Sequence, residues 1–373
     1  MLQPQAFLQA LLSRGIHFYT GVPDSLLKAF CAAVAAVPAP ARHVSAANEG
    51  AAVGLAAGSF LATGQPALVY MQNSGEGNAV NPLASLMDPE VYGIPVLLLV
   101  GWRGQPGVSD EPQHRKQGKI TLPLLEVLGI PYAILAKDDA TAAQQVDVAV
   151  SHMITAHSPY ALVVEKGTFA PFSAAEQPQI LPMSREEAVK AIAASLGPKD
   201  VIVSTTGMAS RELFECRAAA AEGHQRDFLC VGSMGHASQI ALGISLEQPE
   251  RRVWCLDGDG ACLMHMGSLA TIAATAGPRF VHVLLHNGAH DSVGGQPTAA
   301  SALDFAAVAK ALGYPLVLQA DSLSSLQGIL ADLPEAGPVF LEVKVRKGHR
   351  ADLGRPTTTP QQNMSDFMDF LQR

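Results

Sequence analysis

Charged and aromatic residues are scarce in this chain. They make up 16% and 6% of its 373 residues, and the 33 acidic side chains outnumber the 25 Lys and Arg, giving a formal net charge of -8. The sequence contains no basic stripe, which excludes a nucleic-acid surface. No apolar run approaches the roughly 20 residues of a membrane-spanning helix, so we expect no membrane partner. The hydrophobic content of 48% instead predicts a heavily buried α/β protein with extensive subunit contacts.

Cysteine is also scarce, and its distribution excludes a disulfide framework. Its five residues are an odd number, scattered through mostly apolar segments. We therefore expect reduced core residues of a cytoplasmic protein, and neither disulfides nor a zinc site. The stretch Met1 to Pro4 lacks the basic and then apolar pattern of a signal peptide, which favours the same location. The cysteines are Cys31, Cys216, Cys230, Cys255 and Cys262.

Strand-like and helix-like segments alternate along the whole chain. This alternation predicts an α/β protein with two doubly wound parallel sheets, each covered by helices on both faces. We expect helices at 49–61 and 261–276 among others. The proline-containing stretch 171–184 reads as a linker between domains 1–170 and 185–373. Strands are expected near 16–20, 42–46, 67–71, 95–100, 132–135 and 160–165, and near 200–204, 227–231, 253–256, 281–285, 315–319 and 339–345.

An acidic turn and an amide follow two neighbouring predicted strands. The first strand leads into Asp257-Gly258-Asp259-Gly260, and the second leads to Asn287-Gly288-Ala289. Because a helix crosses over between them, both ends lie at the same sheet edge, where ligands of α/β sheets bind. The Asp259 carboxylate, the Asn287 amide and the backbone carbonyl of Ala289 form an incomplete oxygen shell. Such a shell suits Mg²⁺, with a phosphate and water as its remaining ligands.

This unit resembles the thiamin diphosphate motif, in which Gly-Asp-Gly precedes a pair of asparagines. His286 stands at the first asparagine position, which is a departure, whereas Asn287 matches the metal-binding amide. The resemblance implies thiamin diphosphate and Mg as cofactors. It also implies that Met234 wedges the cofactor into a bent shape. The implied cofactor-binding residues are Asn73, Thr206, Gly207, Ser233, Met234, Gly235, Gly258, Asp259, Gly260, Ala261, Asn287 and Ala289, and the metal ligands are Asp259, Asn287 and Ala289.

A lone carboxylate, Glu49, stands at the start of a helix rich in Ala and Gly. Glutamate at such a position often has no other role than a favourable interaction with the helix dipole. Small apolar neighbours, however, would leave Glu49 poorly solvated and raise its pKa from about 4.3. A carboxyl group of this kind can share a proton with an aromatic ring nitrogen. The resemblance implies that Glu49 bonds the aminopyrimidine of the cofactor and promotes loss of the thiazolium proton.

Two loops at the same predicted sheet edge carry groups for a substrate. The loop 101–115 brings two arginines, Gln113 and a histidine, and the loop 21–25 brings Ser25. Arginine's planar fork suits a phosphonate or a sulfonate. With segments 290–298 and 352–356, these loops resemble the phosphonopyruvate decarboxylase family, over essentially the whole chain. The residues expected to bind the substrate are Ser25, Arg103, Gln113 and Arg115.

The resemblance implies decarboxylation of 3-phosphonopyruvate to phosphonoacetaldehyde and CO₂ in phosphonate natural-product (antibiotic) biosynthesis. A pocket acid would then protonate the decarboxylated product, with Asp24, His114 and His290 as candidates. Sulfopyruvate decarboxylase is a near relative and an alternative. A non-catalytic cofactor-binding subunit is disfavoured because Glu49 and the metal ligands are present. A carboligase is disfavoured because the chain lacks a middle domain.

The resemblance also implies an assembly. In this family the pyrimidine-binding domain, expected at 1–170, faces the diphosphate-binding domain of another subunit, expected at 185–373. We therefore expect a homodimer or a higher homo-oligomer in which two chains build each site, acting on a small 2-oxo acid with an anionic tail.

Overall fold

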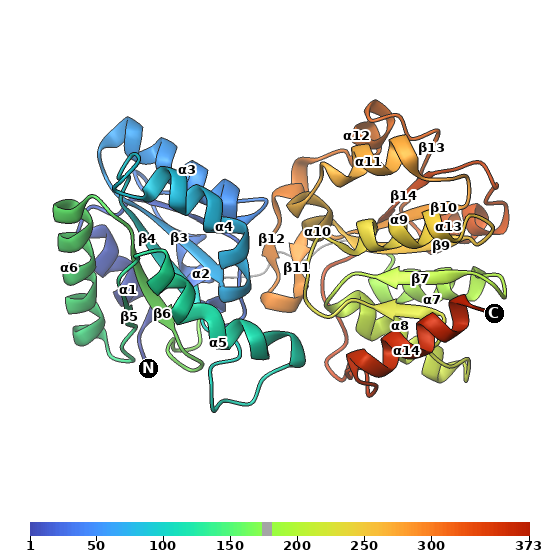
Figure 1. Cartoon of the computed structure of the whole chain (residues 1–373), viewed down its shortest axis with the longest axis horizontal. Helices are drawn as coiled ribbons and strands as arrows, with labels where there is room; N and C mark the ends of the chain where they lie inside the picture. Colours follow the sequence, from blue (N-terminus) through green and yellow to red (C-terminus); the bar gives the residue numbers. More distant parts are fainter. Residues whose placement is uncertain (174–180) are drawn as a thin grey trace. The chain divides into compact units, whose positions relative to one another are not determined.

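The computed structural model describes residues 1–173 and 181–373 and contains two compact units, Met1–Gln177 and Pro178–Arg373 (Figure 1). The boundary between the units falls within the expected linker 171–184. Residues 174–180 of that linker lie outside the described residues. In the part of the chain that is described, no helix combines the length and apolar character needed to cross a bilayer.

The first unit is built on a six-stranded parallel sheet in the order β2-β1-β3-β4-β6-β5. Its strands are β1 (Phe18–Gly21), β2 (Arg42–Ser45), β3 (Ala67–Gln72), β4 (Val96–Gly101), β5 (Tyr132–Ile134) and β6 (Tyr160–Val164). Its helices are α1 (Pro4–Leu12), α2 (Lys28–Val34), α3 (Glu49–Thr63), α4 (Glu76–Pro82), α5 (Pro112–Val127) and α6 (Asp139–Ala156), with a 3-10 turn η1 (Asn73–Gly75) and a π-helical turn η2 (Leu83–Met87).

Both faces of this sheet are buried, as the continuous apolar strands require. Along β4, Leu97 and Leu99 pack into one core with α1, α2 and α6. Leu98 and Val100, which point to the opposite face, pack into a second core with α3. The chain is therefore doubly wound, and the carboxyl ends of the parallel strands share one edge.

The second unit repeats this architecture in the order β13-β14-β10-β9-β7-β8. Its strands are β7 (Val201–Ser204), β8 (Asp227–Leu229), β9 (Val253–Gly258), β10 (Phe280–His286), β13 (Leu316–Ala320) and β14 (Val339–Lys344), all parallel, and a small antiparallel ribbon joins β11 (Ala289–His290) to β12 (Gln296–Pro297). Its helices are α7 (Arg185–Ser195), α8 (Met208–Ala219), α9 (Ala237–Glu247), α10 (Asp259–Met264), α11 (Ser268–Thr275), α12 (Phe305–Ala311), α13 (Leu323–Ala331) and α14 (Pro360–Leu371), with 3-10 turns η3 (Asp291–Val293) and η4 (Ala299–Ala302).

The twelve expected strands and the two doubly wound sheets are confirmed, but two local expectations are wrong. The crossover expected as one helix at 261–276 is two helices, α10 and α11. The backbone leaves the helical region at His265, with φ -134° and ψ 48°, and helix resumes after Gly267. The expected loop 101–115 ends early, because Pro112 occupies the first turn of α5 and its fixed φ favours a helix start there.

Candidate active site

Asp259 directly follows the central strand β9 and begins α10, where it is almost fully buried. Its Oδ1 accepts a hydrogen bond from Gly260 N and its Oδ2 accepts one from Gly288 N, both at 2.5 Å. Burial raises the pKa of this carboxyl group to about 6, even though the backbone donors oppose the shift. Ionising this buried carboxyl group is costly, and a bound divalent cation would offset that cost.

Asn287 lies next to Asp259 across the two central strands. The register of β9 and β10 pairs Gly258 with Leu285, so Asp259 and Asn287 follow at the same edge. Asn287 Oδ1 accepts from Ala289 N at 2.9 Å, and its Nδ2 donates to Asp291 Oδ2 at 2.8 Å. The two bonds fix which way the amide faces.

The Ala289 carbonyl faces away from the β11–β12 ribbon. Gly288 O accepts from Thr298 N and His290 O accepts from Gly295 N, so the residue between them directs its carbonyl to the other side. A carboxylate, an amide oxygen and this carbonyl come from one short stretch of sheet edge. The donor set is hard and all oxygen, and it fits Mg²⁺.

Behind Asn287 lies a buried network that the sequence analysis missed. Asp291 accepts from Arg185 Nη1 at 2.6 Å, and Arg185 also pairs with Glu212 through bonds of 2.8 and 2.9 Å. These residues are more than 20 and more than 100 positions apart, so no local pattern signals the network. It holds Asp291, and through Asp291 it holds the Asn287 amide.

His286, the departure from the asparagine pair, also has a defined partner. Its Nδ1 lies 2.7 Å from Glu342 Oε1 on β14, and its Nε2 lies 3.8 Å from Asp259 Oδ2. Glu342 is fixed in turn by Gln319 at 2.8 Å. The histidine therefore links Asp259 to a buried carboxylate. The Asn287 amide, the predicted metal ligand, keeps its own hydrogen bonds to Ala289 and Asp291.

The ends of β7 and β8 offer groups for a diphosphate. Gly232 N donates to Thr206 Oγ1 at 3.1 Å, which joins the two loops. Ser233 has a left-handed φ of 46°, rare for a residue with a Cβ, and it stands beside the half-buried Met234. Thr205 Oγ1 is buried and finds no partner among the described residues. An orphaned hydroxyl beside the Thr206–Gly207 turn fits a phosphate oxygen, and it is a candidate that the sequence analysis overlooked.

In the first unit, Glu49 begins α3 and is 4% exposed. Asn78 Nδ2 donates to Glu49 Oε2 at 2.8 Å, and burial raises the pKa of the carboxyl group. Gly75 lies directly against the carboxyl group, and a Cβ at that position would clash with it. The fold thus desolvates Glu49 and, within the described chain, offers it the Asn78 side chain as a donor. Asn78 and Gly75, both in the segment after β3, are positioning residues that the sequence analysis did not identify.

Glu76, next to Gly75, is a second buried carboxyl group. It is 3% exposed, and within the described chain neither of its oxygens has a hydrogen-bond partner. Burial raises its pKa to about 8. The group is therefore protonated in the folded protein across most of the neutral range.

Glu76→Gln is expected to remove a pH-dependent loss of stability. The unfolded chain binds this proton only below about pH 4.3, whereas the folded chain holds it up to about pH 8. Stability thus falls as pH rises between these values and is flat above them, a change on the order of 3–5 kcal/mol. Denaturant titrations from pH 5 to 8 measure this slope. We expect it to flatten in E76Q and to persist in Glu90→Gln, an exposed control; equal slopes in wild type and E76Q would contradict the assignment.

Arg103, after β4, is held by the loops around it. It forms a two-bond pair with Asp110 at 2.5 and 2.8 Å, and its Nη1 donates to Ser25 Oγ at 2.7 Å. Asn73 accepts from Arg103 N at 3.2 Å and donates to Arg103 O at 2.8 Å. In this structure the Asn73 side chain holds the arginine loop, while its expected contact with cofactor stays a prediction. Asp110, only seven residues from Arg103, is a partner that the sequence analysis missed.

The three candidate acids differ in the direction in which burial shifts their pKa. Asp24 is fully buried beside Ser25 and Gly101, and burial raises its pKa to about 6. Burial lowers the pKa of both His114 and His290 to about 4. Near pH 7 both histidines are therefore neutral, and Asp24 is closest to its titration point. His290 belongs to the second unit, where its ring packs against Gly260, 2.8 Å from where a Cβ on that glycine would lie.

The expected substrate residues only partly come together. Ser25 and Arg103 are bonded, and the His114 backbone packs directly against Gly104, the residue after Arg103. Gln113 and His114 lie in the first turn of α5 and not in a loop. Gln113 Oε1 and His114 Nδ1 are both buried, and neither has a hydrogen-bond partner in the described chain. Arg115 is exposed on the same helix. The structure therefore does not bring Arg115 into this group.

Comparisons with known proteins agree with this geometry. Residues 4–122 match the family described as thiamine pyrophosphate enzyme, N-terminal TPP binding domain, and residues 203–343 match its C-terminal TPP binding domain. The chain is 36% identical to the phosphonopyruvate decarboxylase of Streptomyces hygroscopicus, over 99% of this chain and 94% of that protein. It is also 36% identical to the phosphonopyruvate decarboxylase of Streptomyces viridochromogenes, over 100% and 95%.

A shorter relative matches part of the chain. The sulfopyruvate decarboxylase subunit beta of Methanothermobacter thermautotrophicus is 39% identical over 45% of this chain and 84% of its own length. Two family domains in order and a full-length match above 30% identity decide the classification. This chain belongs to the thiamine pyrophosphate enzymes and, among them, to the family of the phosphonopyruvate decarboxylases.

Proposed function

We propose that this protein decarboxylates 3-phosphonopyruvate to phosphonoacetaldehyde and CO₂, in phosphonate biosynthesis. The observation that carries the proposal is the match to two phosphonopyruvate decarboxylases over essentially the whole chain. The presence of Glu49, Asp259 and Asn287 in buried, hydrogen-bonded settings supports an active enzyme over a non-catalytic subunit.

Each unit contributes a different part of the site. In the second unit, Asp259, Asn287 and the Ala289 carbonyl would hold Mg²⁺, and the turns at Thr206–Gly207 and Ser233–Gly235 would hold the diphosphate. We assign the pyrimidine to the first unit, where Glu49 lies. Bound thiamin diphosphate supplies a nucleophilic carbon for the ketone of a 2-oxo acid and an electron sink for the pair released with CO₂.

Glu49 moves the proton that starts the reaction. Its carboxyl group is buried and raised in pKa, and Asn78 holds its Oε2. Such a group can exchange a proton with a ligand ring nitrogen, because burial raises its pKa and so favours the protonated form more than water does.

Asp24 is our choice for the acid that protonates the product. Its pKa of about 6 lies closer to neutrality than the pKa of about 4 given by burial to His114 and His290. It lies beside Ser25, which also bonds Arg103, the residue that we assign to the anionic tail.

Arg103 is our choice for the phosphonate contact. Its guanidinium is already paired with Asp110, so an arriving phosphonate shares or displaces that carboxylate. A dianion competes well for this position, because charge-assisted bonds to guanidinium strengthen with the charge of the acceptor.

Arg103→Ala is expected to lower kcat/KM for phosphonopyruvate by roughly ten- to a few-hundred-fold, the effect of about 1.5–3 kcal/mol of lost charge-assisted bonding. The loss for pyruvate, which has no anionic tail, should be much smaller. Steady-state assays on both substrates measure the ratio. Arg42→Ala removes an exposed arginine from the same unit and serves as a control. Equal losses on the two substrates would make Arg103 structural.

The experiment that tests the function offers the purified protein phosphonopyruvate, sulfopyruvate and pyruvate separately, with Mg²⁺ and thiamin diphosphate. CO₂ and aldehyde are measured for each. We expect the highest kcat/KM for phosphonopyruvate. A preference for sulfopyruvate would support the second candidate, favoured by 30% identity to the sulfopyruvate decarboxylase of Methanosarcina acetivorans over 66% of this chain. No CO₂ from any of the three would overturn the proposal.

We also propose a cytoplasmic homo-oligomer, at least a dimer, in which the pyrimidine-binding unit of one chain serves the diphosphate-binding unit of another. The family's division of labour between two domains supports this arrangement. Sedimentation at assay concentration tests it, and a fully active monomer would contradict it.

A further inference from the structure

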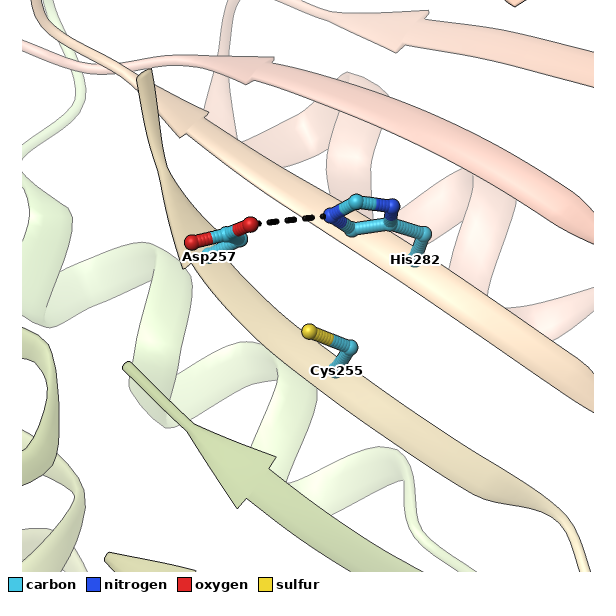
Figure 2. Close-up of side chains that lie close together, drawn as sticks. All are labelled: Cys255, Asp257 and His282. Carbon is cyan, nitrogen blue, oxygen red and sulfur yellow. Dashed lines mark hydrogen bonds and ion pairs between the residues drawn. The ribbon is translucent and has the colours of Figure 1, made fainter. Parts of the chain in front are cut away.

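Three metal-ligating side chains converge inside the second unit, on one face of the central strands (Figure 2). Cys255 and Asp257 are two residues apart on β9, so both point to the same face. His282 on β10 is the register partner of Cys255. Figure 2 shows the imidazole directed toward Asp257, with the Cys255 sulfur beside both.

The three ligand atoms are close enough to share one ion. The Cys255 sulfur, an Asp257 oxygen and a His282 ring nitrogen all lie within 4.8 Å of one another. His282 Nε2 and Asp257 Oδ2 are 3.3 Å apart. This is the separation of two ligands arranged tetrahedrally about zinc at about 2.0 Å. All three side chains are at most 1% exposed.

The surrounding core contains more polar groups than its hydrogen bonds satisfy. His282 Nδ1 and the buried Tyr314 hydroxyl have no partner among the described residues. The aromatic ring of Phe340 packs against both His282 and Tyr314. Buried polar groups without partners are costly in an apolar core, and an ion or water is the usual explanation.

Two further thiols adjoin this cluster. Burial and the nearby Asp257 carboxylate raise the pKa of both Cys230 and Cys262. Both thiols share a buried core cluster with Cys255, but among the described residues only Cys255, Asp257 and His282 have ligand atoms within 4.8 Å of one another. Three of the five cysteines therefore lie in one core cluster of the second unit, which the scattered spacing of the sequence did not indicate.

We propose that Cys255, Asp257 and His282 form a binding site for zinc, separate from the magnesium site at Asp259 and Asn287. Thiolate, imidazole and carboxylate together select a borderline-soft ion such as Zn²⁺ over Mg²⁺. Binding releases the Cys255 thiol proton to solvent. The ion bridges β9 and β10, the strands that carry Asp259 and Asn287, so it would stabilise the frame of the active site. This inference contradicts the expectation that the cysteines form no zinc site.

The test measures zinc on the full chain with excess Mg²⁺ present, which keeps the Asp259 site occupied. Protein from zinc-supplemented medium is dialysed against a weak chelator and its metal content is determined. We expect about one zinc per chain in wild type, and loss of zinc in Cys255→Ala. Cys216→Ser, which alters a half-buried cysteine on α8, should retain it. Cobalt substitution should give thiolate-to-metal charge-transfer absorption in wild type and Cys216→Ser, and not in Cys255→Ala.

A thermal shift gives a second readout that does not depend on activity. Zinc added to the metal-free wild type should raise the melting temperature by roughly 3–5 °C for each tenfold excess over its dissociation constant. Asp257→Asn should show no such rise. Zinc content equal in wild type and Cys255→Ala, or absent from wild type with no thermal shift, would overturn the proposal and leave a hydrogen-bonded His–Asp pair. Neither result depends on which substrate the enzyme uses.

Discussion

Replacing Glu49 by Gln is expected to reduce turnover by roughly 10²–10⁴-fold while cofactor binding persists. The amide has nearly the shape of the carboxyl group and can still meet Asn78, which holds Glu49 Oε2 at 2.8 Å. It cannot take up or release a proton in the working range. Burial raises the pKa of Glu49, but in the variant the side chain at this position does not titrate.

Two measurements separate this effect from damage to the fold. Calorimetry reports thiamin diphosphate affinity, which we expect to be nearly unchanged. Hydrogen exchange at the reactive cofactor carbon, read by NMR after acid quench, should slow in proportion to turnover. Glu90→Gln, an exposed glutamate of the same unit, should behave as wild type in both. Wild-type exchange rates in E49Q would exclude Glu49 from proton transfer.

The architecture was predictable because its signals are local and repeated. Apolar strands separated by helical segments predict doubly wound sheets, and each strand end marks a place where ligand groups collect. Glu49, Asp259 and Asn287 are predicted as site residues because they stand at or near such strand ends. The break between α10 and α11 was missed because the apolar pattern continues through His265 and Gly267.

The pairing of side chains was not predictable in the same way. The bond between His286 and Glu342 depends on the register of β10 and β14. The contact of Arg185 with Asp291 joins residues 106 positions apart. Even the nearby Arg103–Asp110 pair needs a loop conformation that composition does not specify. Such partners set the charge and the orientation of the reactive groups. The sequence therefore identifies the reactive groups better than it identifies their hydrogen-bond and ion-pair partners.

Asp259→Ala is expected to abolish measurable Mg²⁺-dependent retention of thiamin diphosphate. Residues that merely orient metal ligands are worth about 10–100-fold in affinity, so loss of a charged ligand should cost at least about 100-fold. The substitution also removes the acceptor for Gly260 N and Gly288 N, which tie the two strand ends together. Both effects act on the cofactor before any chemistry occurs.

Because a loosened turn could mimic a lost metal ligand, Asp259→Asn is the variant that distinguishes them. The amide oxygen can still accept from Gly260 N or Gly288 N, but it has no charge to offer a cation. If Asp259 binds Mg²⁺, calorimetry should show weak binding in both variants while circular dichroism remains native. Asp369→Ala, on the exposed side of α14, controls for the loss of an acidic residue in this unit. Wild-type Mg²⁺ and cofactor affinity in both folded variants would mean that the diphosphate is held elsewhere. Native affinity in Asp259→Asn but not in Asp259→Ala would assign the aspartate to the turn alone.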